Sequence, residues 1–217
     1  MLTPHEMNIA LHVDAGTVGL LLGAILLVRD KGTPQHRRMG RIFVGFAGVV
    51  CLSALVGTVF FRFIPLFAVL TLLVSYLVLG GWRVVYTQGR GPGVWDALLT
   101  VCAAVGTVLL VPVLMKADLT NGSSMPVIFS TLGAVVVIML YDTAKWFFPR
   151  RWHARLWRYE HTYKVLSALS GMASAAVGNI FHTTIAQLLP SALGTVVIAY
   201  FFWREARRPN PSFPASF

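Results

Sequence analysis

The chain of 217 residues is 56% hydrophobic and only 12% charged, with a mean hydropathy of +0.71. Soluble domains carry about 25% charged residues, so this composition excludes an ordinary soluble domain and favours a protein whose solvent is the lipid bilayer. The net charge of +10 does not predict nucleic-acid binding, because the lysines and arginines stand between apolar runs and form no basic stripe with interleaved aromatic residues.

Seven apolar segments follow one another along the chain, each close to the roughly 20 residues that cross a hydrocarbon core about 30 Å thick. The runs are continuously apolar, and they lack the alternating pattern of a membrane β-barrel. The sequence therefore predicts an all-α bundle of seven transmembrane helices that forms one domain over residues 1–208, with a disordered tail over 209–217. The predicted spans cover residues 9–28, 42–61, 64–82, 97–115, 126–141, 165–181 and 186–203.

Several helix ends are marked by their residues. Thr3, Pro4 and Glu6 predict an N-cap, a proline in the first turn and a capping glutamate, so the first helix is expected to begin near Pro4. We expect Asp96 to cap the fourth span and Pro190 to lie in the first turn of the last one.

The basic residues fall on one side when the spans are threaded in turn. Sixteen of the 18 lysines and arginines share the side of residues 29–41, and only Arg62 and Lys116 lie on the other. All six tryptophans fall at the same basic side, where indole rings anchor a membrane protein. The positive-inside rule then predicts an outside N-terminus and a cytoplasmic C-terminus, with anionic lipid headgroups as contacts of the cytoplasmic face.

Ionisable residues inside a span are costly, so they are the first candidates for function. On the outer side, His12 and Asp14 lie in the first span and His182 ends the sixth, where Asn179 is placed to fix its tautomer. Asp14 is the best candidate for a protonatable group, whereas Asp142 is expected to form a simple ion pair with the lysine three residues later.

Each outer histidine stands at the end of a helix face made of small residues, which allow helix backbones to approach closely. We expect these two faces to pack together, to line one cavity, or to contact a second copy or a membrane partner. The faces comprise Gly16, Gly19 and Gly23 in the first span and Gly171, Ala175 and Gly178 in the sixth.

On the inner side, His36 and Arg37 open the second span and His161 opens the sixth. The two histidines are a second candidate pair; the alternative is that the His-Arg cluster anchors the chain to lipid headgroups. Neutral imidazole is a good ligand for haem iron, copper or zinc. His12, His182, His36 and His161 are therefore candidate cofactor ligands, with haem b as the candidate cofactor.

His12, the glycine-spaced stretch after it and the turn His36-Arg37-x-x-Gly40-Arg41 resemble a widespread family of small bacterial predicted membrane proteins of unknown function. In that family a histidine also precedes a later small-residue helix, as His161 does here. The resemblance covers most of the chain and implies a multi-pass protein of the bacterial cytoplasmic membrane, but it supplies no reaction. A looser likeness, by histidine placement, is to membrane b-type cytochromes.

Three functions remain open from the sequence. The first is binding of haem b or a metal by the histidines, for electron transfer or cofactor handling. The second is a small transporter or proton-coupled permease with a polar pocket around Asp14, His12 and His182. The third is a scaffold or assembly subunit. An enzyme of the hydrolase or kinase type is not expected, because the chain has no P-loop, His-Glu-x-x-His motif or nucleophile elbow.

Overall fold

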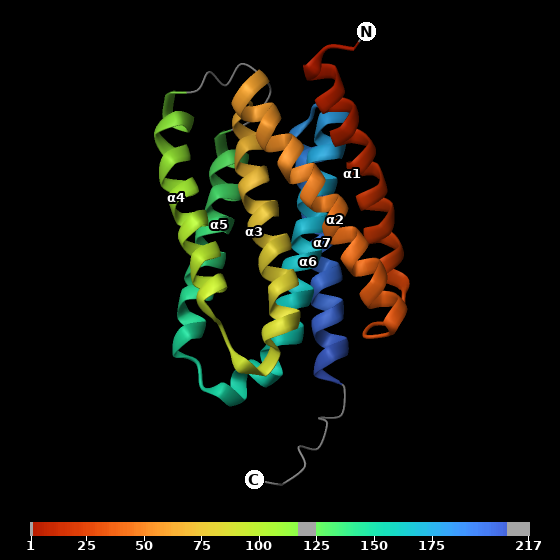
Figure 1. Ribbon diagram of the computed structural model, residues 1–217, viewed down its shortest axis with the longest axis vertical. Helices are drawn as coiled ribbons and strands as arrows, with labels where there is room; N and C mark the ends of the chain where they lie inside the picture. The colour runs from red at the N-terminus through yellow and green to blue at the C-terminus, as the bar shows by residue number, and fades with distance from the viewer. Residues whose placement is uncertain (1, 117–124, 208–217) are drawn as a thin grey trace.

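The computed structural model describes residues 2–116 and 125–207, which form a bundle of seven long helices (Figure 1). Each helix is long and apolar enough to cross a membrane, so the predicted all-α bundle of seven spans is confirmed and the chain is a multi-pass membrane protein. The predicted tail over 209–217 lies outside the described residues. The helices are α1 Pro4–Val28, α2 Pro34–Val56, α3 Pro65–Thr87, α4 Val94–Lys116, α5 Met125–Ala144, α6 Arg150–Phe181 and α7 Thr184–Ala206.

Successive helices run in opposite directions, so the N-terminus and the end of α7 lie at opposite ends of the bundle (Figure 1). We call the end where α1, α3, α5 and α7 finish the basic end, which is the lower end in Figure 1, and the other the N-terminal end. Helices α3 and α6 pack against each other at the centre. Helices α1, α2 and α7 flank them on one side, and α4 and α5 on the other.

The apolar core is centred on α3, which contributes more buried residues than any other described helix. Its side chains Val74 and Leu77 pack with Val135 and Ile138 of α5 in a cluster that extends to α1, α2, α4 and α6. Helix α7, by contrast, has no buried residue among those described. Its exposed side chains are largely apolar, as expected of a helix that faces lipid.

Local signals account for most helix ends. Thr3 and Glu6 form the predicted capping box of α1, with Pro4 in its first turn. The prediction for Pro190 was wrong: α7 begins at Thr184, because the Thr183 hydroxyl accepts a hydrogen bond from the Ala186 N–H, and Pro190 is the seventh residue of the helix.

Three short segments complete the described chain. Helix α2 continues into a π-helical turn, η1 Gly57–Phe61, and two 3₁₀ turns, η2 Gln88–Arg90 and η3 Lys145–Phe147, follow α3 and α5 at the basic end. Helix α6 begins well before the predicted span, because the aromatic and basic stretch that precedes the span forms its first turns. These extensions bring α3, α5 and α6 together at the basic end.

Candidate functional site

Two pairs of opposite charges sit at helical spacing near the basic end. Asp142 and Lys145 are three residues apart at the end of α5, and Glu160 and Lys164 are four residues apart on α6. Residues three or four apart share one face of a helix. Each helix therefore presents one carboxylate and one ammonium group toward the other.

The four side chains close into a ring of alternating charge. The Lys145 Nζ lies 2.9 Å from Asp142 Oδ1 and 2.7 Å from Glu160 Oε1. The Lys164 Nζ lies 2.7 Å from Asp142 Oδ1 and 2.8 Å from Glu160 Oε1. Each ammonium group is thus held between two carboxylates, and all four side chains are only 2–7% exposed. We call these four residues the charge ring.

Helices α3 and α4 complete the surroundings of the ring. The Tyr76 hydroxyl of α3 donates to Asp142 Oδ2 at 2.5 Å, and its oxygen lies 3.0 Å from Thr100 Oγ1 of α4. Gly80 gives Lys164 the space to reach the ring, since a Cβ at this position would lie 3.2 Å from the Lys164 Nζ. The ring therefore links α5 to α6 directly and engages α3 and α4 through Tyr76.

The ring has no net charge, because two carboxylates balance two ammonium groups. Removing a charge from water costs several kcal/mol even inside a real protein, and close opposite charges offset that cost only when the geometry is good. Every ring member meets this condition, with contacts of 2.9 Å or less. A proton added to either carboxylate leaves a net positive charge in a buried place, so the arrangement is sensitive to a single protonation.

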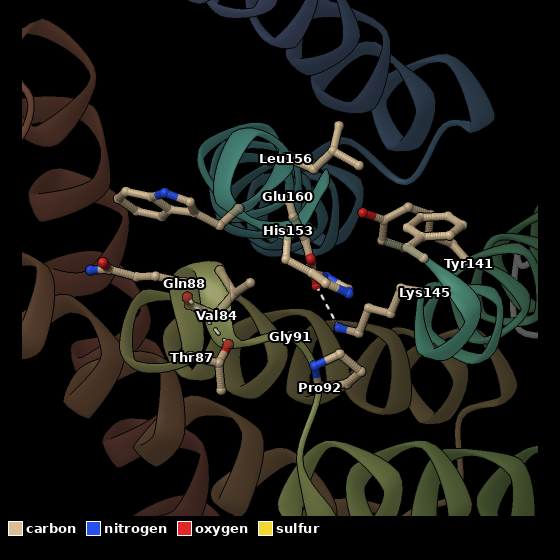
Figure 2. Close-up of a pocket in the computed structure, with 12 residues that line it drawn as sticks. Val84, Thr87, Gln88, Gly91, Pro92, Tyr141, Lys145, His153, Leu156 and Glu160 are labelled. Atoms are coloured by element: carbon tan, nitrogen blue, oxygen red, sulfur yellow. Dashed lines mark hydrogen bonds and ion pairs between the residues drawn. The ribbon is translucent and has the colours of Figure 1, made fainter. Parts of the chain in front are cut away.

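A small cavity borders the ring at the basic end (Figure 2). Lys145 and Glu160 point toward each other across one wall of it, joined by their ion pair (Figure 2). Its free volume of about 10 Å³ is roughly what one water molecule requires. One water molecule can therefore occupy the space beside Lys145 and Glu160. The remaining lining residues are Val84, Thr87, Gln88, Gly91, Pro92, Tyr141, Phe148, His153, Leu156 and Trp157.

The turn between α3 and α4 forms one wall of the cavity in a strained conformation. Gln88 has φ 41° and ψ −118°, a combination that non-glycine residues rarely adopt, and such strain costs about 1–3 kcal/mol. Gly91 has φ 80°, and a Cβ there would lie 3.0 Å from the His153 ring. The turn is therefore packed closely against the start of α6, beside Glu160.

A second ion pair lies near the ring but outside it. Arg83 of α3 binds Asp96 of α4 through two parallel contacts, Nε to Oδ1 at 3.1 Å and Nη2 to Oδ2 at 3.0 Å. Asp96 is the third residue of α4 and also accepts from the Gly93 N–H at 2.8 Å, so it caps the helix from inside its first turn. The pair is more exposed than the ring and involves only two charges.

The outer histidine His12 is bound to the neighbouring helix. Its Nδ1 lies 2.9 Å from the Ser53 Oγ of α2, and that hydroxyl lies 2.8 Å from the Val49 carbonyl oxygen. The Ser53 hydroxyl has a single proton, so it donates either to a carbonyl of its own helix or to His12, and the bond to His12 forms with either tautomer of the imidazole. Asn8 adds a hydrogen bond to the Ser53 carbonyl at 3.1 Å.

The other outer candidates do not gather around His12. His182 ends α6 with φ 52° and an exposed side chain, and no contact with His12 or hydrogen bond from Asn179 is among those described. Asp14 is exposed on the outer face of α1. The polar pocket predicted around Asp14 is therefore not found among the described residues, because the two nearby polar side chains Asn8 and His12 turn toward α2.

The two glycine faces pack, but not against each other. Cβ atoms at Gly19 and Gly23 of α1 would meet Met172 and Leu169 of α6. On α6, Gly171 instead faces Val74 of α3 and Gly178 faces Gln187 of α7. Of the alternatives left open by the sequence, the α1 face contacts α6, but it does so through Met172 and Leu169 and not through the small residues of α6.

The inner histidines lie near each other at the basic end. The Nδ1 of His161 donates to the Gly81 carbonyl at 2.8 Å, which leaves its Nε2 with the lone pair. His36 lies close enough to His161 for their charges to interact, and its own Nδ1 is buried without a hydrogen-bond partner. Arg37 closes the adjoining turn by donating from Nε to the Gly32 carbonyl at 3.2 Å.

The described residues contain no group of three or more histidine, cysteine, aspartate or glutamate side chains that could hold a metal ion. His12 and His161 do not belong to one site. Gly23 of α1 lies level with Leu169 of α6. On α1, His12 lies eleven residues from this level toward the N-terminal end, and on α6, His161 lies eight residues from it toward the basic end. At 1.5 Å per residue they are about 28 Å apart along the bundle. The role of the four histidines as cofactor ligands stays a prediction.

The charge ring was missed by reasoning from sequence. Asp142 does pair with Lys145 as expected, but this pair is one side of a four-membered ring. The available signal was a second opposite-charge pair, Glu160 and Lys164, at helical spacing in the next helix. The adjacent glycines Gly80 and Gly81 of α3, which make room for Lys164, were a second available signal.

Comparisons with known proteins do not assign the chain to a family. No protein-family model, curated protein or solved structure matches the chain. The resemblance to small bacterial membrane proteins therefore stays a prediction, and the site has to be interpreted from its own chemistry.

Proposed function

We propose that the protein is a proton-coupled permease for a small anionic solute, and that the charge ring is its proton-exchange site. One observation carries this proposal: two buried carboxylates are each held by two ammonium groups, and one of them, Glu160, lines a water-sized cavity at one end of a membrane bundle. Ionisable residues inside a membrane bundle typically mark ion and proton pathways.

The coupling follows from the charge balance of the ring. A proton that arrives through the cavity binds Glu160 or Asp142, neutralises that carboxylate and raises the net charge of the ring from zero to +1. The two lysines then lack one of their counter-charges, so the ring holds less tightly or binds an anion in place of the lost charge. Uptake of one proton with one monovalent anion restores neutrality, and this sets the substrate class.

The cavity lies on the basic-end side of the ring. Beyond Tyr76 toward the N-terminal end, the interior is filled by apolar residues such as Leu73, Val135 and Ile138. Transport then requires a second arrangement in which the ring is exposed to the other end. We further propose that the basic end faces the cytoplasm of a bacterial cytoplasmic membrane, following the positive-inside rule, so that the described state is the one open inward.

The test is solute-driven proton movement in proteoliposomes that contain a pH-sensitive dye. A panel of small mono- and dicarboxylates is added to the outside, and a member that enters with a proton acidifies the lumen. Glu160→Gln and Asp142→Asn are expected to abolish this signal. Asp96→Asn, which removes a carboxylate at the same end but outside the ring, is expected to retain it. Equal acidification by Glu160→Gln and the unaltered protein contradicts the proposal.

Haem or metal binding is a second candidate, favoured by the tautomer of the half-buried His161. Its Nδ1 donates to the Gly81 carbonyl, which leaves its Nε2 lone pair available for a metal. His12 lies too far away along the bundle to share that site. A sharp α-band in a reduced-minus-oxidised optical spectrum that is lost in His161→Gln supports this candidate. A colourless protein free of iron, copper and zinc removes it.

A further inference from the structure

The turn between α1 and α2 holds a lysine in a fixed position at the basic end. The Lys31 ammonium group donates to the Leu26 and Leu27 carbonyls at the end of α1. It also lies 4.7 Å from the centre of the Phe201 ring of α7. These contacts pin the charge between the ends of two helices and prevent it from extending freely into solvent.

Further cationic or polar groups converge on the same place from two other helices. Arg204 lies three residues after Phe201 and shares its face of α7. Burial and the positive charge of Arg204 lower the pKa of Lys31, and Asp30 opposes the effect. His36 lies in the first turn of α2, within electrostatic range of Lys31, and its buried Nδ1 has no hydrogen-bond partner.

Two cations therefore stand close together at this place. Arg204 repels Lys31, and Asp30, which lies in an exposed turn, opposes this repulsion. The first turn of α2 adds the positive end of a helix dipole. Convergent cations and a helix N-terminus are features with which proteins bind phosphate groups, and His36 Nδ1 can donate to a phosphate oxygen when it carries a proton.

We propose that Lys31, His36 and Arg204 form a binding site for a phosphate group, carried either by an anionic phospholipid or by free inorganic phosphate. The site lies where α1 and α7 end and α2 begins, at the level at which a bilayer presents its headgroups. It does not depend on the charge ring or on the proposed transport.

The test compares ligand binding to the purified full-length protein by native mass spectrometry. The probes are phosphatidylglycerol, phosphatidylcholine and inorganic phosphate. The variants are Lys31→Met, His36→Gln and Arg204→Gln, with Arg155→Gln as the matched control, because Arg155 is an exposed cation at the same end of the bundle. Arg204→Gln and His36→Gln keep the test decisive if Lys31→Met fails to fold.

We expect one phosphatidylglycerol to be retained in preference to phosphatidylcholine. Its affinity is expected to fall about fivefold in Arg204→Gln, the size of effect that one cation near an anionic lipid typically has, and to be unchanged in Arg155→Gln. If inorganic phosphate binds with the same dependence on the variants and lipid does not, the free ion is the ligand. An equal loss in all basic variants, or no preference for either anionic probe, overturns the proposal.

Discussion

The two ends of the bundle bury polar groups in different ways. At the N-terminal end, Asn8, His12 and Ser53 join α1 to α2 by hydrogen bonds that involve no charged partner. At the basic end, the ring joins α5 to α6 with four full charges. Hydrogen bonds between neutral groups are sufficient to hold two helices together. The additional charges are therefore the feature that calls for a functional explanation.

The largest effect is expected from removing one ammonium group of the ring. Lys164→Met leaves Asp142 and Glu160 with Lys145 as their only ring cation, so one negative charge stays buried without compensation. We expect a loss of about 3–5 kcal/mol in the free energy of unfolding, as for other broken buried pairs. The measurement is unfolding of the purified protein in detergent by heat or denaturing surfactant.

The double variant Asp142→Asn with Lys164→Met is the control for this prediction. It removes one charge of each sign and restores neutrality, so part of the lost stability is expected to return. If the double variant is as unstable as the sum of the two single variants, the ring members do not act together.

The sequence predicted the helices and their ends much better than it predicted the charge ring. Seven spans, their boundaries near Val28 and Pro65, and the capping box at Thr3 all follow from local signals of apolar length, proline and capping residues. The ring does not, because it depends on how α5 and α6 are rotated about their axes. The spacing of Glu160 and Lys164 showed that they share a face, but not which helix that face meets.

The same limit explains the outer histidines. His12 and His182 were correctly placed toward the ends of their helices, but their directions were not known. His12 faces Ser53 because α1 packs along α2, and His182 is exposed because it is the C-cap of α6. Glycine spacing left open whether α1 contacts α6 or a partner, and in the structure Leu169 and Met172 of α6 pack against the α1 glycines.

An intermediate effect is expected when a neutral group next to the ring is removed. Tyr76→Phe deletes the hydroxyl that donates to Asp142. Hydrogen bonds to charged groups contribute about 1.5–3 kcal/mol, so the same unfolding measurement is expected to show a loss of that size. Tyr86→Phe, at an exposed position of the same helix, is expected to have little effect. Equal effects of the two variants mean that Tyr76 does not support the ring.

The smallest effect is expected at the N-terminal end. Ser53→Ala removes the hydroxyl that bonds to His12 but leaves the bond from Asn8 to the Ser53 carbonyl. A neutral hydrogen bond contributes about 1 kcal/mol, so the loss of stability should be well below that of Lys164→Met. Ser130→Ala, whose hydroxyl donates to the Val127 carbonyl within its own helix, is the matched control. A loss as large as that of Lys164→Met removes the contrast between the two ends.

The most direct test of the central claim asks whether protonation opens the ring. A single cysteine is introduced as Thr87→Cys at the cavity wall, after the two free native cysteines, Cys51 and Cys102, are replaced by alanine. Its reaction rate with a membrane-impermeant thiol reagent added at the basic end is measured as the pH is lowered. Each rate is divided by the rate at which the same reagent modifies a free cysteine peptide at the same pH. This division corrects for the change in thiolate fraction with pH. The account predicts that the corrected rate rises with acidification, and that Glu160→Gln, which mimics the protonated carboxylate, reacts fast at every pH. A corrected rate that is independent of pH and identical in Glu160→Gln contradicts it.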